Sequence, residues 1–334
     1  MTAISLGDLA QTLLLRQSIT ATRSTIDAAT ADLSTGQTSD PGRHLGGHTA
    51  RLSAIQSTLN RIDAQEAGLA TARIRAEAMQ TALGQIDSVT AKVADTLLSA
   101  SQSVLMPGLL AVGRQSLAAL ESTVASLNQR SMGQSIFAGT ATDGPALAPA
   151  GDILAAASAA TATAQSPADI ARMLDDWLSD PAGFAAVAGL GNADGVSVPI
   201  GDGKRIALDV TALDPGLRQT FKGLILGALL TEGRFATTPA GQGELARLSA
   251  ESLLSAVPPR GEVSARLGLS QSRIEDAATR LSAENSALQR ARNDLLSVDM
   301  YETSSRLTES ETRLKALYAL TARLSSLSLT GYMR

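Results

Sequence analysis

The sequence predicts a mainly α fold: a long antiparallel helical bundle or coiled coil formed by the N- and C-terminal segments, with a small inserted α+β domain. Apolar residues recur at heptad spacing toward both ends of the chain, whereas the middle lacks this period. Aromatic residues are only 2% of the 334 residues, so burial must come mainly from Leu, Ile, Val and Ala. We expect a helical segment at 1–138, an inserted variable α+β domain at 139–214 and a second helical segment at 215–334.

The first expected helix has inward positions seven residues apart and ends before a turn. These positions are Thr12, Ile19, Ile26 and Leu33, and the pattern stops at STGQTSDPG, residues 34–42. A Gly- and Pro-containing stretch of this kind is typical of a chain reversal between two helices.

The longest expected helix runs from about residue 49 to 104. At about 1.5 Å per residue it would be roughly 80 Å long. Its heptad positions are Ile55, Ile62, Leu69, Ala76, Leu83, Thr90 and Leu97, with Met79, Ile86 and Val93 at the companion position. Pro107 and Gly108 end this helix, and a third helix is expected to return antiparallel to it. Its inward positions are Leu110, Leu117 and Val124, interleaved with Leu120 and Leu127.

The middle of the chain predicts short elements. Ser166 is placed as an N-cap before Pro167, and Asp214 before Pro215 starts a later helix. Alternating apolar residues at 196–200 and 206–210, around a Gly-Asp-Gly turn, predict a β-hairpin whose first strand, with Pro199, lies at an edge. A further helix is expected near 242–256.

The last long helical segment contains a break. Leucine or isoleucine recurs every seven residues from 274 to 295, and the period resumes at Met300 after a register shift. Asp299 and Glu302 resemble a capping pair, so the helix is expected to stop and restart there.

Composition and motifs argue against several classes of function. The chain has no cysteine, which removes disulfides and thiolate chemistry, and its net charge of -4 without a basic cluster argues against a nucleic-acid partner. His44 and His48 have the spacing of metal ligands on a helix, but two glycines lie between them, so a polar loop is the better interpretation. The stretch GLGNADG at 189–195 is followed by a strand instead of the helix that a phosphate-binding loop requires, so it is interpreted as a turn. We expect no enzyme activity, no cofactor, no metal and no membrane insertion. The N-terminus has no pattern of a cleaved signal peptide.

The apolar stripes at the two ends of the chain are the candidate assembly interface. An intramolecular coiled coil accounts for the stripes at 49–127 and 262–295, but those at 1–33 and 300–334 reach the chain ends, where an isolated helix is marginal. We expect neighbouring copies to complete them. The candidate interface residues are Leu9, Leu13, Ile19, Ile26, Leu33, Leu307, Leu314, Leu317, Leu324 and Leu327.

Several segments resemble the flagellin superfamily. They are LSTG at 33–36 after an amphipathic start, SIFAGT at 135–140 where the helices give way to the inserted domain, and residues 291–329 with their Leu-rich closing helix. The ending LSLTGYMR is more similar to hook-filament junction proteins than to filament flagellins. The resemblance covers roughly residues 1–145 and 215–334.

The resemblance implies a structural component of the bacterial flagellum that self-associates as a ring at the junction between hook and filament. It implies contacts with a hook-side junction protein and with flagellin, an export chaperone on the C-terminal helix, and an extracellular location reached by type III export without a cleaved signal peptide. Two alternatives stay open at this point: a short flagellin that forms the filament itself, and a cytoplasmic coiled-coil scaffold.

Overall fold

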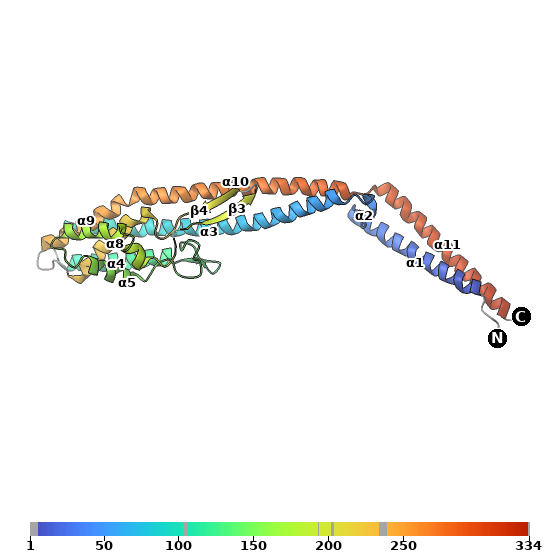
Figure 1. Ribbon diagram of the computed structural model, residues 1–334, viewed down its shortest axis with the longest axis horizontal. Coiled ribbons are helices and arrows are strands. Elements are labelled where there is room, and N and C mark those ends of the chain that lie inside the picture. Colours follow the sequence, from blue (N-terminus) through green and yellow to red (C-terminus); the bar gives the residue numbers. More distant parts are fainter. Residues whose placement is uncertain (1–5, 103–105, 193, 202–203, 234–238, 333–334) are drawn as a thin grey trace. The chain divides into compact units, whose positions relative to one another are not determined.

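The structure, a computed structural model, describes residues 6–102, 106–192, 194–201, 204–233 and 239–332. It is mainly helical, which confirms the predicted fold class. Contacts divide the chain into two compact units, one made of Met1–Asp63 with Ser282–Arg334 and the other of Ala64–Leu281 (Figure 1). The boundaries expected from the sequence near 138 and 214 stay a prediction.

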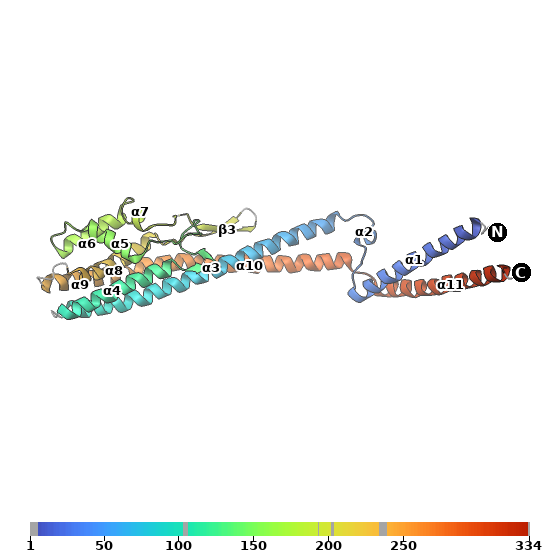
Figure 2. The same ribbon diagram turned by 90° about the horizontal axis from the view of Figure 1, so that it is seen from below.

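The unit that contains both chain ends is built on a pair of long helices. Helix α1 (Leu6–Thr35) packs along α11 (Met300–Tyr332) in antiparallel fashion, so the N- and C-termini lie at the same end of the pair (Figures 1 and 2). The unit also contains α2 (Pro41–His44), the start of α3 (Ala50–Ser101) and the end of α10 (Val257–Leu296). The predicted helix break is therefore confirmed, because α10 and α11 are separate helices.

Two short linkers join these helices through backbone hydrogen bonds. Gly36 has a left-handed φ of 69° and ends α1, as glycine does at many helix C-termini. The linker after it pairs with the linker between α10 and α11: Thr38 N donates to Leu296 O at 2.8 Å and Val298 N donates to Gly36 O at 3.2 Å. Asp299 then caps α11 by accepting the backbone N–H groups of the second and third residues after it. The predicted capping role of Asp299 is confirmed.

The second unit contains most of the hydrophobic core. Along α3 every predicted heptad position is buried, and so are the three companion positions. In this unit α3 lies beside α4 (Met106–Leu127), and α4 also packs on α8 (Arg218–Ala228) (Figures 1 and 2). The seven-residue period therefore identified the buried face of the longest helix correctly.

The predicted stripe of α4 is confirmed in part. Leu120, Val124 and Leu127 are buried as predicted, whereas Leu117 is half-buried and Leu110 is exposed; the buried face also includes Leu109, which was not predicted. The reason is that α4 has neighbours on more than one side, so its buried face is wider than a two-helix seam. The backbone of Gly113 shows the close packing, since a Cβ atom there would lie 2.9 Å from the Cβ of Leu230.

The region between α4 and α8 consists of short helices and two hairpins. Strands β1 (Arg130–Ser131) and β2 (Gln134–Ser135) form one antiparallel pair, and β3 (Val196–Gly201) and β4 (Lys204–Leu208) form the predicted second hairpin, with an irregular register between Pro199 and Gly201. Helix α6 (Pro167–Ser179) has the predicted cap, because the Ser166 hydroxyl accepts from Asp169 N at 3.1 Å. Helices α5 (Ala150–Ala160) and α7 (Phe184–Ala188) and the first hairpin were not predicted.

The second unit is completed by the helices that follow. A 3₁₀ turn, η1 (Pro215–Leu217), leads into α8, and a second, η2 (Leu229–Glu232), ends it; α9 (Pro239–Ser255) packs on α8 before α10 begins. An aromatic cluster links α6, α7 and α8: the ring centroids of Trp177 and Phe184 are 5.6 Å apart and those of Phe184 and Phe221 are 4.8 Å apart.

Candidate functional site

The α1–α11 pair is the candidate site, and its seam alternates large and small side chains. The isoleucines and leucines in the seam are half-buried, whereas the small residues between them are buried. Spacings of three and four residues place the set on one face of each helix. The seam residues of α1 are Ile19, Thr22, Ile26, Ala29 and Leu33, and those of α11 are Thr303, Leu307, Ser310, Leu314 and Leu317.

This composition makes the pair weaker than an ordinary leucine-rich coiled coil. Small residues let two helices approach closely but contribute little apolar area, and each buried CH₂ group is worth only about 0.8 kcal/mol. The hydroxyls of Thr22 and Thr303 do not tie the two helices together, because each donates to a carbonyl of its own helix or cap, Ser18 O at 2.8 Å and Asp299 O at 2.7 Å. Two helices also cannot enclose the large side chains, which therefore stay half in solvent.

Leucines near the free ends of the pair are largely exposed. Leu13 is 60% exposed and Leu320 is 52% exposed, and Leu14 and Leu324 are exposed as well. In Figure 2 the two helices diverge toward the N- and C-termini. An apolar surface of this kind is stabilised only when something covers it.

The predicted interface residues therefore fall into three groups. The structure brings Ile19, Ile26 and Leu33 of α1 together with Leu307, Leu314 and Leu317 of α11 along the seam. Leu13 and Leu324 lie on α1 and α11 with exposed side chains. The side chains of Leu9 and Leu327 lie outside the described residues. A role of this set in assembly stays a proposal.

Some residues of the surface were missed by the heptad pattern. Leu14 lies beside the seven-residue series, and the small seam residues carry no hydrophobic signal. The three-and-four spacing would have found Thr22 and Ala29 if the small residues had been counted as seam positions.

Electrostatic contacts contribute little to the pair. The guanidinium carbon of Arg23 lies 5.7 Å from the centroid of the Tyr318 ring, a cation–π contact between α1 and α11. The Glu302–Arg306 ion pair, at 2.9 Å, joins residues of one helix and is exposed on both sides, so it is worth at most about 0.5 kcal/mol.

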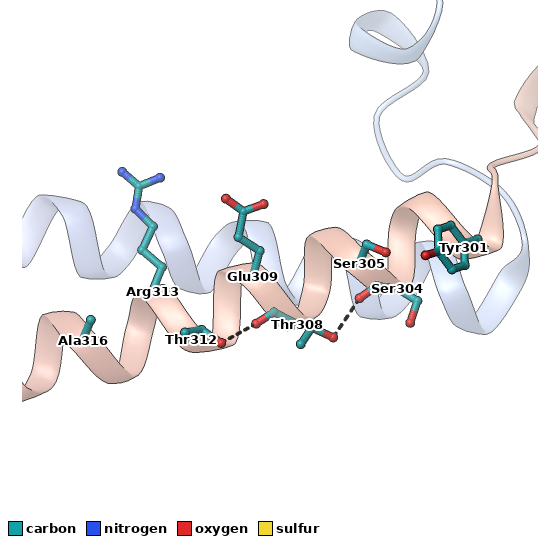
Figure 3. Close-up of a pocket in the computed structure, with 8 residues that line it drawn as sticks. All are labelled: Tyr301, Ser304, Ser305, Thr308, Glu309, Thr312, Arg313 and Ala316. Atoms are coloured by element: carbon teal, nitrogen blue, oxygen red, sulfur yellow. Dashed lines mark hydrogen bonds between the residues drawn. The ribbon is translucent and has the colours of Figure 1, made fainter.

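A shallow hollow of about 770 Å³ lies on α11 (Figure 3). Two of its hydroxyl groups are used within the helix, since Thr308 donates to Ser304 O at 3.1 Å and Thr312 donates to Thr308 O at 2.9 Å. The charged side chains at its edge are Glu309 and Arg313. The eight lining residues all belong to α11 and none of them is a seam position, so the hollow lies apart from the contact with α1.

The other motifs singled out in the sequence do not form a site. His44 ends α2 and His48 follows it, both exposed, and no cluster of three metal-ligating side chains occurs in the part of the chain that the structure describes. Among the described helices, none combines the length and hydropathy that a membrane span requires.

Comparison with known families agrees with this helical arrangement. Residues 256–333 match the family model of the bacterial flagellin C-terminal helical region, which here comprises α10 and α11. The resemblance to the flagellin superfamily is thereby confirmed for this C-terminal region.

Solved structures with a similar arrangement include flagellar proteins. A putative flagellar hook-associated protein from Vibrio parahaemolyticus is 14% identical, with 73% of this chain and 95% of that chain covered and a TM-score of 0.47. FlgL of Bacillus cereus is 15% identical, with 72% of this chain and 99% of that chain covered and a TM-score of 0.48. The comparison with curated proteins gave no significant match.

Proposed function

We propose that this chain is a structural subunit of the bacterial flagellum that self-associates through its terminal helices and forms the junction between hook and filament. The observation that carries the proposal is the α1–α11 pair, whose seam leaves its large side chains half-buried and whose leucines near the free ends are exposed. Copies of the pair packed side by side would bury this surface and supply the stability that two helices alone lack.

The remaining parts of the proposal follow from the same helices. The subunits form a ring, with a hook-side junction protein on one side and flagellin on the other. Before assembly an export chaperone covers the C-terminal helix, because exposed leucines on α11 would otherwise associate prematurely. The chain reaches the cell exterior through the flagellar type III apparatus without a cleaved signal peptide.

A filament-forming flagellin is the second candidate, since the matching family model is that of a flagellin region. A deletion strain and imaging of purified flagella separate the two functions. Bare hooks with flagellin shed into the medium, and antibody labelling confined to the distal end of the hook, support the junction. Labelling along the whole shaft, or loss of the protein that forms it, supports a filament subunit instead.

The interface itself is tested by placing charge in the seam. We expect the double variant Leu317→Asp with Leu324→Asp to stay soluble as a monomer and to lose assembly, because burying two carboxylates in an apolar contact is strongly unfavourable. The matched control is Ser304→Asp with Thr308→Asp, which adds the same charge to the polar hollow of the same helix. Unchanged incorporation of the Leu317/Leu324 variant into flagella contradicts the assignment of the interface.

A further inference from the structure

One Asp–Gly pair of the chain lies on an open turn. The sequence contains three such pairs, Asp143–Gly144, Asp194–Gly195 and Asp202–Gly203, and the last of them lies outside the described residues. Asp143 is exposed, and its carboxylate has no hydrogen bond or ion pair with any residue that the structure describes. A Cβ atom built on Gly144 would meet no heavy atom within 4 Å beyond its chain neighbours. The peptide group between Asp143 and Gly144 therefore has room to rotate.

This arrangement allows the side chain to react with the backbone nitrogen that follows it. The Gly144 nitrogen attacks the side-chain carbon of the protonated Asp143 carboxyl group, a C–N bond forms, and the carboxyl hydroxyl leaves with the amide proton as one molecule of water. The product is a succinimide ring. Glycine favours this closure because it has no Cβ atom to obstruct the approach of its nitrogen.

Solvent water then opens the ring at one of its two carbonyl groups. Attack at the side-chain carbonyl restores aspartate. Attack at the backbone carbonyl gives isoaspartate, in which the chain continues through the side chain and the former backbone carbonyl becomes a carboxylate. The water taken up replaces the water released, so no other reactant is required and the mass of the chain is unchanged.

The second described pair is held by packing. A Cβ atom on Gly195 would lie 2.5 Å from the Cα of Asp209, and one on Gly139 would lie 2.7 Å from the backbone oxygen of Asp194. The backbone on both sides of this peptide group is thus packed against neighbouring chain, and turning the Gly195 nitrogen toward the Asp194 carboxyl carbon would disturb these contacts. The fold therefore distinguishes two chemically similar pairs.

The open turn lies between two anchored positions. Ser135 N donates to Thr142 O at 2.9 Å on one side, and Leu147 N donates to Asn128 Oδ1 at 2.8 Å on the other. Isoaspartate adds one CH₂ group to the backbone between them. Because Asp143 and Pro145 are exposed, the longer backbone can extend into solvent, and the product is compatible with the folded chain.

We propose that Asp143 is a modification site, at which the folded chain forms a succinimide with Gly144 and then isoaspartate, in preference to Asp194. The reactants are the chain itself and solvent water. This inference is independent of the proposed function.

Incubating the full chain in neutral buffer made with heavy-oxygen water measures the reaction, because each ring opening places one labelled oxygen at the reacting residue. Peptide mass spectrometry should find label and isoaspartate at position 143, and less of both at 194. In urea the two pairs should react at similar rates, because packing no longer restrains either one. The proposal is overturned if position 143 stays unlabelled in the folded chain, or if position 194 is labelled as fast or faster.

Two variants test whether the ring is the route. Gly144→Ala places a Cβ atom beside the attacking nitrogen and fits the fold, since the space around Gly144 is open. Asp143→Glu keeps the charge but would require a larger ring that closes less readily. Both variants should lose the label at position 143 while label at 194 is unchanged. Labelling of either variant at the wild-type rate at position 143 overturns the proposal.

Discussion

Removing the carboxylate of Asp87 should destabilise the second unit more than removing the arginine with which it pairs. The Arg260 side chain is only 3% exposed, whereas that of Asp87 is 48% exposed. Arg260 Nε donates to Asp87 Oδ1 at 2.6 Å, and Arg260 Nη1 donates to the buried Thr220 hydroxyl at 2.9 Å. One guanidinium thereby ties α10 to α3 and α8.

The magnitudes follow from which group is left buried. Asp87→Ala leaves a buried cation without its counter-charge. Breaking a fully buried pair in this way costs about 3–5 kcal/mol of the free energy of unfolding. Because water already reaches half of this carboxylate, we expect a cost of about 2–3 kcal/mol. Arg260→Met keeps most of the volume and lets Asp87 regain water, so the main loss is the bond to Thr220, about 1 kcal/mol.

Urea unfolding followed by Trp177 fluorescence measures both variants, because Trp177 is the only tryptophan in the sequence and lies in the same unit. The double variant Asp87→Ala with Arg260→Met should be close to Arg260→Met alone, since no cation is left unpaired. If Asp87→Ala costs less free energy of unfolding than Arg260→Met, the explanation by a buried unpaired charge is wrong.

Three other predictions concern local features. Arg75→Met should reduce hydrogen-exchange protection at 135–139 about tenfold or more, because the buried guanidinium donates to the carbonyls of Ser135 and Ile136 at 3.0 Å; equal protection in the variant contradicts this role. The Ser166 hydroxyl, together with Arg172, lowers the pKa of Asp169 below its usual 3.8, so this cap stabilises the fold above that pH and the contribution is lost as the pH falls through the lowered value. In acid titrations the Ser166→Ala variant should therefore lose less free energy of unfolding than the wild type as the pH falls. Gly36→Ala should lower the free energy of unfolding by about 1 kcal/mol, because Gly36 has a left-handed φ. Gly84→Ala should raise it by a similar amount, because Gly84 lies in a helix with open space around it. Thermal melts measure both changes.

The seven-residue period identified the long helices because burial on one side of a helix repeats along the chain. It placed the core face of α3 at every position from Ile55 to Leu97, and the Asp299 cap marked the start of α11. In α4, which has several neighbours, it was right for Leu120, Val124 and Leu127 but wrong for Leu110. It gave no signal for the alanine-rich α5, which has good helix formers but no periodic stripe.

The amino-acid sequence by itself determined the helical class, the break between α10 and α11, the caps and the flagellin-like C-terminal region, since all of these depend on residues close together in the chain. The sequence also predicted that the N- and C-terminal segments pack together. Only the tertiary structure decided that Thr22 and Ser310 fill the α1–α11 seam and that Leu13 and Leu320 stay exposed. It also decided that the carboxylate paired with Arg260 is Asp87. Such contacts join residues far apart in sequence, and whether a leucine is covered depends on how closely a second helix approaches it, which spacing along one helix does not specify.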